Sequence, residues 1–256
     1  MLHDIRTIGA SVFARADRAH SGLTEFKSRS DIGEGRFPEA QFSGAPGSPS
    51  SLPDSGQKLK RAADLALAVF LVPFVLTFGT LLLLLIMLDG GQPFFSHRRI
   101  GRNGVAFGCL KFRTMLPDAE ARLKSLLADD AAANAEWAET SKLKNDPRVT
   151  RIGRFLRKSS LDELPQLWNI IRGEMSFVGP RPVTSEELCR YGEDAALYLA
   201  CKPGITGLWQ IHGRNDVDYA SRVAFDARYA RERSVLLDLR ILLLTIPVVL
   251  GRKGAY

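Results

Sequence analysis

The longest apolar stretch of the chain runs from Leu65 to Leu88 and contains no charged residue. As a straight helix it would measure roughly 36 Å, which is enough to cross a hydrocarbon core of roughly 30 Å. Pro73 lies inside the stretch, where a proline removes one helical hydrogen bond and favours a kink. We therefore predict a membrane-inserted helix.

Basic residues flank this stretch on both sides: Lys60 and Arg61 precede it, and Arg98 and Arg99 follow it. Positive charge normally marks the cytoplasmic side of a membrane. A simple span would place one basic cluster on the opposite side, whereas a kinked helix that returns would keep both clusters inside. The flanking charges and Pro73 alone leave both topologies open.

The segments on either side of the stretch differ in pattern. Residues 1–57 mix Ser, Gly and Pro with few large apolar residues, which predicts a disordered cytoplasmic tail. The segment 93–115 is predicted to form a β-hairpin, because Asn103-Gly104 is a strong type I′ turn signal between two apolar-rich runs.

Apolar residues at helical spacing predict further helices near residues 117–140, 148–157, 219–233 and 235–250. The last of these is too short and too polar to span a membrane comfortably, so it is expected to lie at the interface. A short helix is predicted to begin near Pro165 and to end at Gly173. Trp168 falls on its apolar stripe and is expected in the core.

The densest cluster of candidate chemistry lies around Asp162 and Glu163, two adjacent carboxylates that follow a run of cations. One carboxylate can attack phosphorus while the other holds a metal, which suits a phosphorylated substrate. An isolated Asp-Glu pair more often serves a helix N-terminus, where anions interact well with the macrodipole. The motifs around the pair favour the chemical interpretation.

Four motifs follow one another along the chain. They are Lys111-Phe112-Arg113-Thr114-Met115, Arg157-Lys158-Ser159-Ser160-Leu161-Asp162-Glu163-Leu164-Pro165-Gln166, Gly173-Glu174-Met175-Ser176-Phe177-Val178-Gly179-Pro180-Arg181-Pro182 and Lys202-Pro203-Gly204-Ile205-Thr206-Gly207. This set closely resembles the bacterial sugar transferases, the monotopic polyprenyl-phosphate phosphoglycosyl transferases that begin exopolysaccharide and glycoconjugate assembly. The resemblance covers about residues 58–256.

The resemblance implies an enzyme that transfers a sugar 1-phosphate, with galactose or glucose as the sugar, from a UDP-sugar to undecaprenyl phosphate and releases UMP. Asp162 would be the nucleophile that forms an aspartyl phosphosugar, and Glu163 would hold Mg²⁺. Arg157 would neutralise the diphosphate with its planar fork. Arg181, fixed between two prolines, would help to bind nucleotide or phosphate.

Lys111 and Arg113 fall on one face of the predicted hairpin. Solvent-facing charge is an equally good interpretation of the pattern alone, but the resemblance favours a place beside the substrate phosphates. The Lys202–Gly207 motif is expected to be a loop whose N–H groups could contribute to a phosphate nest.

The family anchor is a re-entrant helix broken near a proline, which favours the returning topology with Lys60, Arg61 and Pro73 as anchor residues. We therefore expect a mainly α fold with a small β-hairpin, a kinked re-entrant membrane helix and interfacial amphipathic helices. The expected parts are a tail at 1–57, an anchor at 58–92 and a catalytic domain at 93–256. The resemblance places the catalytic domain on the cytoplasmic face of the inner membrane.

Composition restricts the alternatives. A net charge of +7 and a pI near 9.5 suit nucleic acid, an anionic membrane or an anionic substrate. No recognition helix or aromatic platform accompanies the basic residues, so nucleic acid is not expected as a partner. An inactive scaffold of the same family would lack UMP release, and the intact Asp162–Glu163 pair argues against it. A homodimer stays open.

Overall fold

The computed structural model describes residues 54–140, 143, 145–213 and 217–251. Within them the chain is mainly helical, with one antiparallel hairpin and one short parallel strand pair, which confirms the predicted fold class in outline. The helices are α2 (Asp54–Leu88), α3 (Ala119–Asp129), α4 (Ala131–Thr140), α5 (Arg151–Ser159), α6 (Gln166–Arg172), α7 (Ser185–Cys189), α8 (Ala195–Leu199), α9 (Leu208–Ile211), α10 (Tyr219–Glu232) and α11 (Val235–Leu250). The strands are β1 (Phe94–Ile100), β2 (Ala106–Phe112), β3 (Ser176–Val178) and β4 (Gly204–Thr206), and the 3₁₀ turns are η2 (Arg102–Gly104), η3 (Leu161–Glu163) and η4 (Gly192–Asp194).

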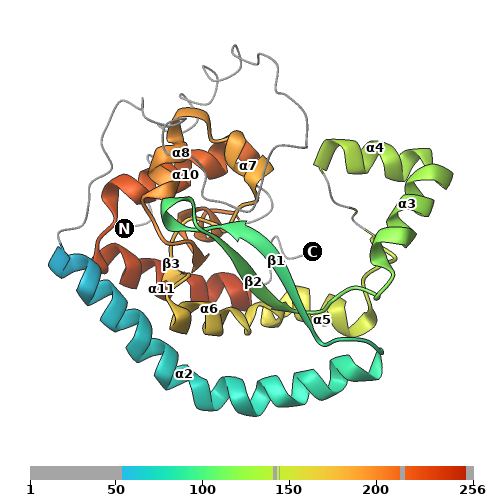
Figure 1. Cartoon of the computed structure of the whole chain (residues 1–256), viewed down its shortest axis with the longest axis horizontal. Coiled ribbons are helices and arrows are strands. Elements are labelled where there is room, and N and C mark those ends of the chain that lie inside the picture. The colour runs from blue at the N-terminus through green and yellow to red at the C-terminus, as the bar shows by residue number, and fades with distance from the viewer. Residues whose placement is uncertain (1–53, 141–142, 144, 214–216, 252–256) are drawn as a thin grey trace.

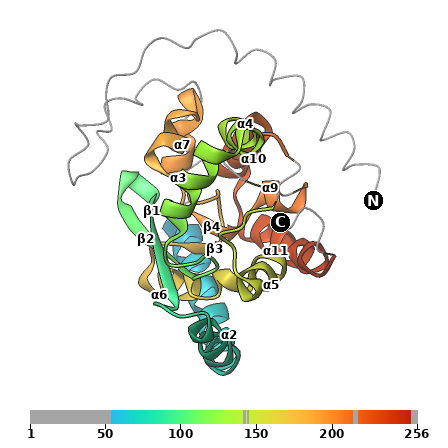
Figure 2. The same ribbon diagram turned by 90° about the vertical axis from the view of Figure 1, so that its right-hand side faces the viewer.

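Helix α2 contains the whole apolar stretch and is long and apolar enough to cross a membrane. It lies below α6 and the hairpin in Figure 1 and again below α5 and α6 in Figure 2. Its apolar residues Ala68, Leu82 and Ile86 are buried, whereas Phe70 and Leu88 are among many that are exposed. The predicted tail lies outside the described residues, except that residues 54–57 form the start of α2.

Strands β1 and β2 form the predicted hairpin, with Phe94 opposite Phe112 at its open end. Asn103 and Gly104 have φ values of 58° and 74°. A type I′ turn requires positive φ at both central residues. The turn prediction is therefore confirmed.

The helix predicted at 117–140 is two helices, α3 and α4, so that prediction was wrong. Asp130 separates them because its backbone is extended, with φ −124° and ψ 103°. Its carboxylate accepts hydrogen bonds from the N–H groups of Ala132 and Ala133 at 2.9 and 3.0 Å. A side chain that caps its neighbours in this way starts a new helix. Figure 1 shows both helices projecting from the body of the molecule.

Helix α6 ends as predicted at Gly173, whose φ is 82°. However, Trp168 is 55% exposed, so its expected place in the core was wrong. The buried face of α6 carries Gln166, Leu167, Asn169 and Ile170 instead. Asn169 is buried because it satisfies the backbone of β2: it accepts from the Leu110 N–H at 3.0 Å and donates to the Gly108 carbonyl at 2.8 Å.

The Lys202–Gly207 motif is not the predicted loop, because Gly204–Thr206 form β4, which pairs in parallel with β3. The two chains approach so closely that a Cβ on Gly204 would lie 2.1 Å from the Gly179 nitrogen. The Gly204 N–H donates to the Pro180 carbonyl at 2.8 Å, so it is not available to a phosphate nest. The motif instead fixes the backbone just before Arg181.

Helices α10 and α11 lie where the periodicity predicted them. Val223, Phe225 and Tyr229 of α10 are buried as expected. The largest apolar cluster joins α2, the hairpin, α6, β3, α8, α9, α10 and α11. This core holds the four sequence motifs, which are distant from one another in sequence, on one body.

Candidate active site

Asp162 and Glu163 lie on the short turn η3, between α5 and α6. Ser160 makes this turn possible by adopting a left-handed conformation, with φ 57° and ψ 17°. Its N–H still donates to carbonyls of the last turn of α5. A left-handed serine is uncommon and carries a conformational cost, which the surrounding packing must offset. The turn presents the two carboxylates to the hairpin.

Lys111 of β2 meets both carboxylates. Its Nζ lies 2.7 Å from Glu163 Oε1 and 3.6 Å from Asp162 Oδ2. Burial alone would lower the pKa of Lys111, but the charges of Glu163 and Asp162 outweigh burial and raise it. The residue predicted beside the substrate phosphates therefore stands between the two predicted catalytic acids.

Asp162 is only 8% exposed. Burial raises the pKa of its carboxyl, and the charge of Glu163 raises it further, while Lys111 and Arg157 oppose the rise. The cations thus favour the ionised carboxylate, which is the form that can attack phosphorus.

Arg157, in the last turn of α5, is held by Thr114. Its Nε donates to Thr114 Oγ1 at 2.9 Å. Thr114 is in turn fixed by α5, because its carbonyl accepts from the Thr150 N–H at 3.0 Å. Gly153 lets the helix come this close, since a Cβ there would lie 2.0 Å from the Thr114 oxygen. The predicted diphosphate-binding arginine is thus positioned beside Asp162.

Arg181 lies over the ring of Trp209, with its Cζ 5.3 Å from the ring centre. Arg222 lies over the same ring at 4.9 Å. The charge of Arg181 opposes the rise in the pKa of Lys111, so Arg181 acts on the same site. Trp209 and Thr114 are site residues that were not predicted from the sequence. The available signals were that Trp209 is an aromatic residue close after the last motif and that Thr114 lies inside the first motif.

Arg113 is not brought to the carboxylate pair. Its Nη2 donates to the Ile86 carbonyl near the end of α2 at 3.0 Å, and its N–H donates to the Pro93 carbonyl at 2.8 Å. Its Nη1 is buried and has no hydrogen-bond partner within the part of the chain that is described. Contact with substrate phosphates stays a prediction for Arg113.

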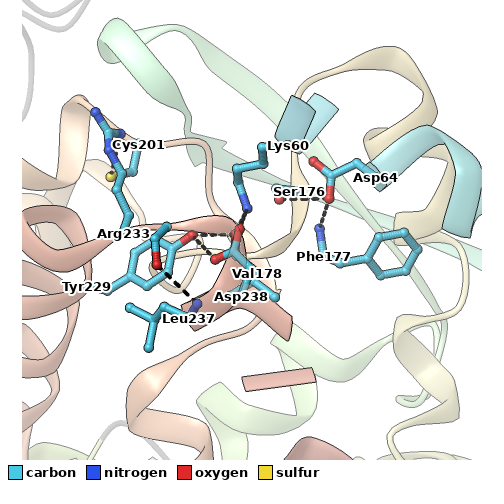
Figure 3. A network of polar contacts seen from close by, with 11 residues as sticks. Lys60, Asp64, Ser176, Phe177, Val178, Cys201, Tyr229, Arg233, Leu237 and Asp238 are labelled. Carbon is cyan, nitrogen blue, oxygen red and sulfur yellow. Dashed lines mark hydrogen bonds and ion pairs between the residues drawn. The ribbon is translucent and has the colours of Figure 1, made fainter. Parts of the chain in front are cut away.

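The predicted anchor residues Lys60 and Arg61 join α2 to the catalytic body. Lys60 pairs with Asp238 of α11 at 2.5 Å, as Figure 3 shows. Arg61 donates to the carbonyls of Ile170 and Ile171 at 2.5 and 2.8 Å. A cation suits these carbonyls because they lie at the C-terminal end of α6.

Asp64 and the predicted anchor residue Pro73 also lie in α2. Asp64 is buried and accepts from the Ser176 hydroxyl at 3.0 Å and from the Phe177 N–H at 3.1 Å, as Figure 3 also shows. Pro73 lies inside α2. The Thr77 hydroxyl donates to the Pro73 carbonyl at 2.9 Å, a local bond that bends helices.

No group of three or more His, Cys, Asp or Glu side chains gathers to hold a metal in the described ranges. Asp162 and Glu163 nevertheless provide two adjacent carboxylates. Mg²⁺ is usually bound by one or two carboxylates together with substrate phosphates and water. The residues therefore fit a Mg²⁺ ion that binds with a phosphorylated substrate.

The chain belongs to the bacterial sugar transferase family, whose model matches residues 55–252. This finding confirms the resemblance that the four motifs indicated.

Individual relatives extend the comparison. The chain is 52% identical over 202 residues to the UDP-galactose-lipid carrier transferase of Erwinia amylovora and 49% identical over 202 residues to the undecaprenyl-phosphate galactose phosphotransferase of Salmonella typhimurium. Each match covers 79% of this chain and 42% of the relative. The exopolysaccharide production protein ExoY of Rhizobium meliloti is 52% identical over 202 residues, which cover 78% of this chain and 89% of the relative. This chain thus spans about two fifths of the first two relatives and most of the third.

Proposed function

We propose that this chain transfers a sugar 1-phosphate from a UDP-sugar to undecaprenyl phosphate and releases UMP, at the start of exopolysaccharide or glycoconjugate synthesis. Family membership supports the reaction class. Two relatives are named for galactose, and a Xanthomonas campestris relative, 40% identical over 178 residues, is named for UDP-glucose. Galactose and glucose are therefore the first sugars to test.

The observation that carries the proposal is the buried Asp162 carboxylate beside Lys111 and Glu163. In the proposed first step, an Asp162 oxygen attacks the sugar-proximal phosphorus of the UDP-sugar. An O–P bond forms, the bond from that phosphorus to the bridging oxygen breaks, and UMP leaves with the electron pair. In the second step, an oxygen of the lipid phosphate attacks the same phosphorus. The aspartyl O–P bond breaks and restores the Asp162 carboxylate.

The cations around the pair suit this chemistry because each step brings anions together. Lys111 lies close enough to both carboxylates to offset their charge before substrate binds. Arg157, fixed by Thr114, would hold the diphosphate through its planar fork. Arg181 would bind nucleotide or phosphate from its rigid turn. Glu163 would hold Mg²⁺, which offsets charge on phosphate oxygens when an anion attacks.

We infer further that α2 enters one leaflet and returns, with its two ends on the cytoplasmic side. Its first turns are bound to the catalytic body through Arg61 and Asp64. Its last turns pack against the same body, where Leu82 and Ile86 share a cluster with Phe112. A straight helix of 35 residues would separate its ends by about 52 Å. Contact of both ends with one body, and the changing course of α2 in Figure 1, support re-entry over a span.

The reaction is tested with purified chain in nanodiscs that contain undecaprenyl phosphate, incubated with a panel of UDP-sugars. We expect UMP release with at least one UDP-sugar, and parallel-line initial-rate plots against both substrates. Asp162→Asn should abolish release because an amide does not form the acyl phosphate, whereas Asp129→Asn on the exposed surface of α3 should not change it.

The intermediate provides the sharper outcome. UDP-sugar alone should give UMP in an amount equal to the enzyme, with a phosphosugar adduct on the peptide that contains Asp162. Near-normal UMP release by Asp162→Asn, or an adduct on another residue, would instead favour direct attack by the lipid phosphate. A chain that folds, binds UDP-sugar and releases no UMP with any sugar would favour the scaffold alternative.

A further inference from the structure

A second cationic pocket lies at the start of α2, apart from the Asp162 site. Four segments form it: the first turns of α2, the hairpin turn, the segment after α8 and the end of α10. Its charged lining residues are Lys60, Arg61, Asp64, Arg102, Lys202 and Arg233. Five of these six are cations. Figure 3 draws three of these lining residues, with Lys60 between Arg233 and Asp64 in the view.

The pocket and the catalytic pair lie at opposite ends of α6. Arg61 is bound to the carbonyls of Ile170 and Ile171 near the C-terminal end of this helix, whereas Asp162 and Glu163 precede its first residue. A helix of seven residues is about 10 Å long. A group in the pocket is therefore not in contact with the reacting phosphorus.

Among the residues described, carboxylates offset only part of the positive charge of the pocket. Lys60 pairs with Asp238. Arg61 bonds to neutral carbonyls, and Arg102 bonds to the side-chain oxygen of Gln57 at 3.0 Å. Asp64 accepts hydrogen bonds from neutral donors of β3, so its charge still offsets one of the five cations. The pocket thus keeps an excess of positive charge.

Lys202 is the clearest sign of this excess. It makes no hydrogen bond or ion pair within the described part of the chain, although it is half-buried. Its Nζ and the Arg61 guanidinium approach the same point, 3.5 and 3.6 Å from where a Cβ on Gly173 would lie. Burial lowers the pKa of Lys202, and the charges of Arg61 and Arg102 lower it further. A partly buried ammonium among other cations is unfavourable unless an anion joins it.

We propose that this pocket binds a phosphate group through Lys202, Arg61 and Arg102. Guanidinium forks and ammonium groups that converge on one small space match the several oxygen acceptors of a phosphate. The apolar stretch of α2 begins at Leu65, one residue after the pocket's Asp64. This position fits the headgroup of an anionic phospholipid, and inorganic phosphate is the second source of the same chemistry. The inference does not depend on the reaction proposed above.

The test uses the full chain in nanodiscs and measures how fast an amine-reactive reagent labels Lys202, read by peptide mass spectrometry. Lys124, exposed on α3, is the internal control. Three conditions share one ionic strength: neutral phosphatidylcholine with chloride, the same lipid with inorganic phosphate, and phosphatidylcholine with phosphatidylglycerol. We expect a phosphate group bound in the pocket to slow the labelling of Lys202 at least threefold relative to that of Lys124. Protection in the phosphatidylglycerol condition alone identifies a lipid headgroup, and protection by phosphate in neutral discs identifies the free ion.

If Lys202 reacts too slowly for its labelling rate to be compared with that of Lys124, thermal unfolding tests whether the pocket binds phosphate. The thermal unfolding midpoint of the wild type should rise with phosphate or phosphatidylglycerol, relative to chloride in neutral discs, because a ligand that binds the folded chain stabilises it. Lys202→Gln should lose most of that rise, and Lys124→Gln should keep it. Equal midpoint changes in all three chains, with no change in the Lys202 labelling ratio, would overturn the proposal. UMP release by Lys202→Gln, tested separately, reports on the reaction alone.

Discussion

Asp226 offers a quantitative test of how burial acts in this fold. It lies in α10 and is 1% exposed. The Tyr191 hydroxyl donates to its Oδ2 at 2.8 Å, while Oδ1 has no hydrogen-bond partner among the residues described. Burial raises the pKa of Asp226 to about 7, against the opposing effects of Tyr191 and of the Arg181 N–H.

Because folding raises the pKa of Asp226, this residue makes the stability of the chain depend on pH. The ordinary pKa is 3.8. Between that value and about 7, the folded chain keeps a proton on Asp226 that the unfolded chain releases, so stability falls as the pH rises through this window. The full difference corresponds to about 4 kcal/mol, of which about 3 kcal/mol would be lost between pH 5 and pH 8.

Asp226→Asn removes this titration and keeps an oxygen for Tyr191. We therefore expect the mutant to gain stability relative to wild type as the pH rises from 5 to 8. The assay is the thermal unfolding midpoint in detergent, where 3 kcal/mol corresponds to a relative gain of about 6–12 °C for a chain of this size. Asp194→Asn, at a partly exposed ion pair with Arg231, is the matched control and should show no such gain. Parallel curves for wild type and Asp226→Asn across this range would refute the burial argument.

Three further outcomes follow from the structure. Arg157→Lys should lower kcat/KM at least tenfold in UMP release, because an ammonium cannot keep the Thr114 bond and bind a diphosphate bidentately; activity within threefold of wild type would contradict this. Gly153→Ala should lower the free energy of unfolding by about 1–3 kcal/mol, because the added Cβ clashes with Thr114. The control is Gly79→Ala in α2, whose added Cβ meets no atom closer than 3.9 Å and should be tolerated in the same melting assay. Single cysteines at positions 55 and 96, in a chain without native cysteines, should both resist an impermeant thiol reagent on intact cells and react after permeabilisation; labelling at position 55 alone would establish a true span.

The elements with strong local signals were predictable from sequence. The Asn103-Gly104 turn and the α10 periodicity needed no tertiary information, because positive φ and a 3.6-residue repeat are local properties. Strands β3 and β4 were not predictable in the same way. Each has three residues, too few to show alternation, and they pair only because Gly179 and Gly204 allow a close approach.

The candidate site shows the same division. Adjacent motif residues identified Asp162 and Glu163, and the structure brings Lys111 to them. The prediction for Trp168 was wrong because Asn169, a polar residue, determines which face of α6 is buried. Asn169 hydrogen-bonds to backbone groups at the free edge of β2, and this turns Trp168 toward the surface. An apolar pattern cannot reveal that choice, since it depends on which backbone groups elsewhere need partners.

Four consecutive residues, 111–114, connect α2 to the candidate active site. Lys111 contacts Asp162 and Glu163, and Thr114 holds Arg157. The two residues between them face α2 instead: Phe112 packs in a cluster with Leu82 and Ile86, and Arg113 donates to a carbonyl near the end of that helix. The segment that places Lys111 beside the two carboxylates therefore also packs against the end of α2.

This arrangement means that α2 contributes to the geometry of the candidate site as well as to the proposed membrane attachment. A buried Phe side chain is worth about 1.5–3 kcal/mol, and a hydrogen bond to a charged group about as much again. Removing α2 would expose Phe112 and leave Arg113 without its partner in that helix. The segment that positions Lys111 and Thr114 would then lose a large part of the stabilisation of about 5–15 kcal/mol that is typical of a folded domain. A fragment freed of its apolar helix is therefore expected to lose the ordered carboxylate–lysine cluster, and the reaction proposed for this chain is tied by its packing to the membrane that holds the acceptor.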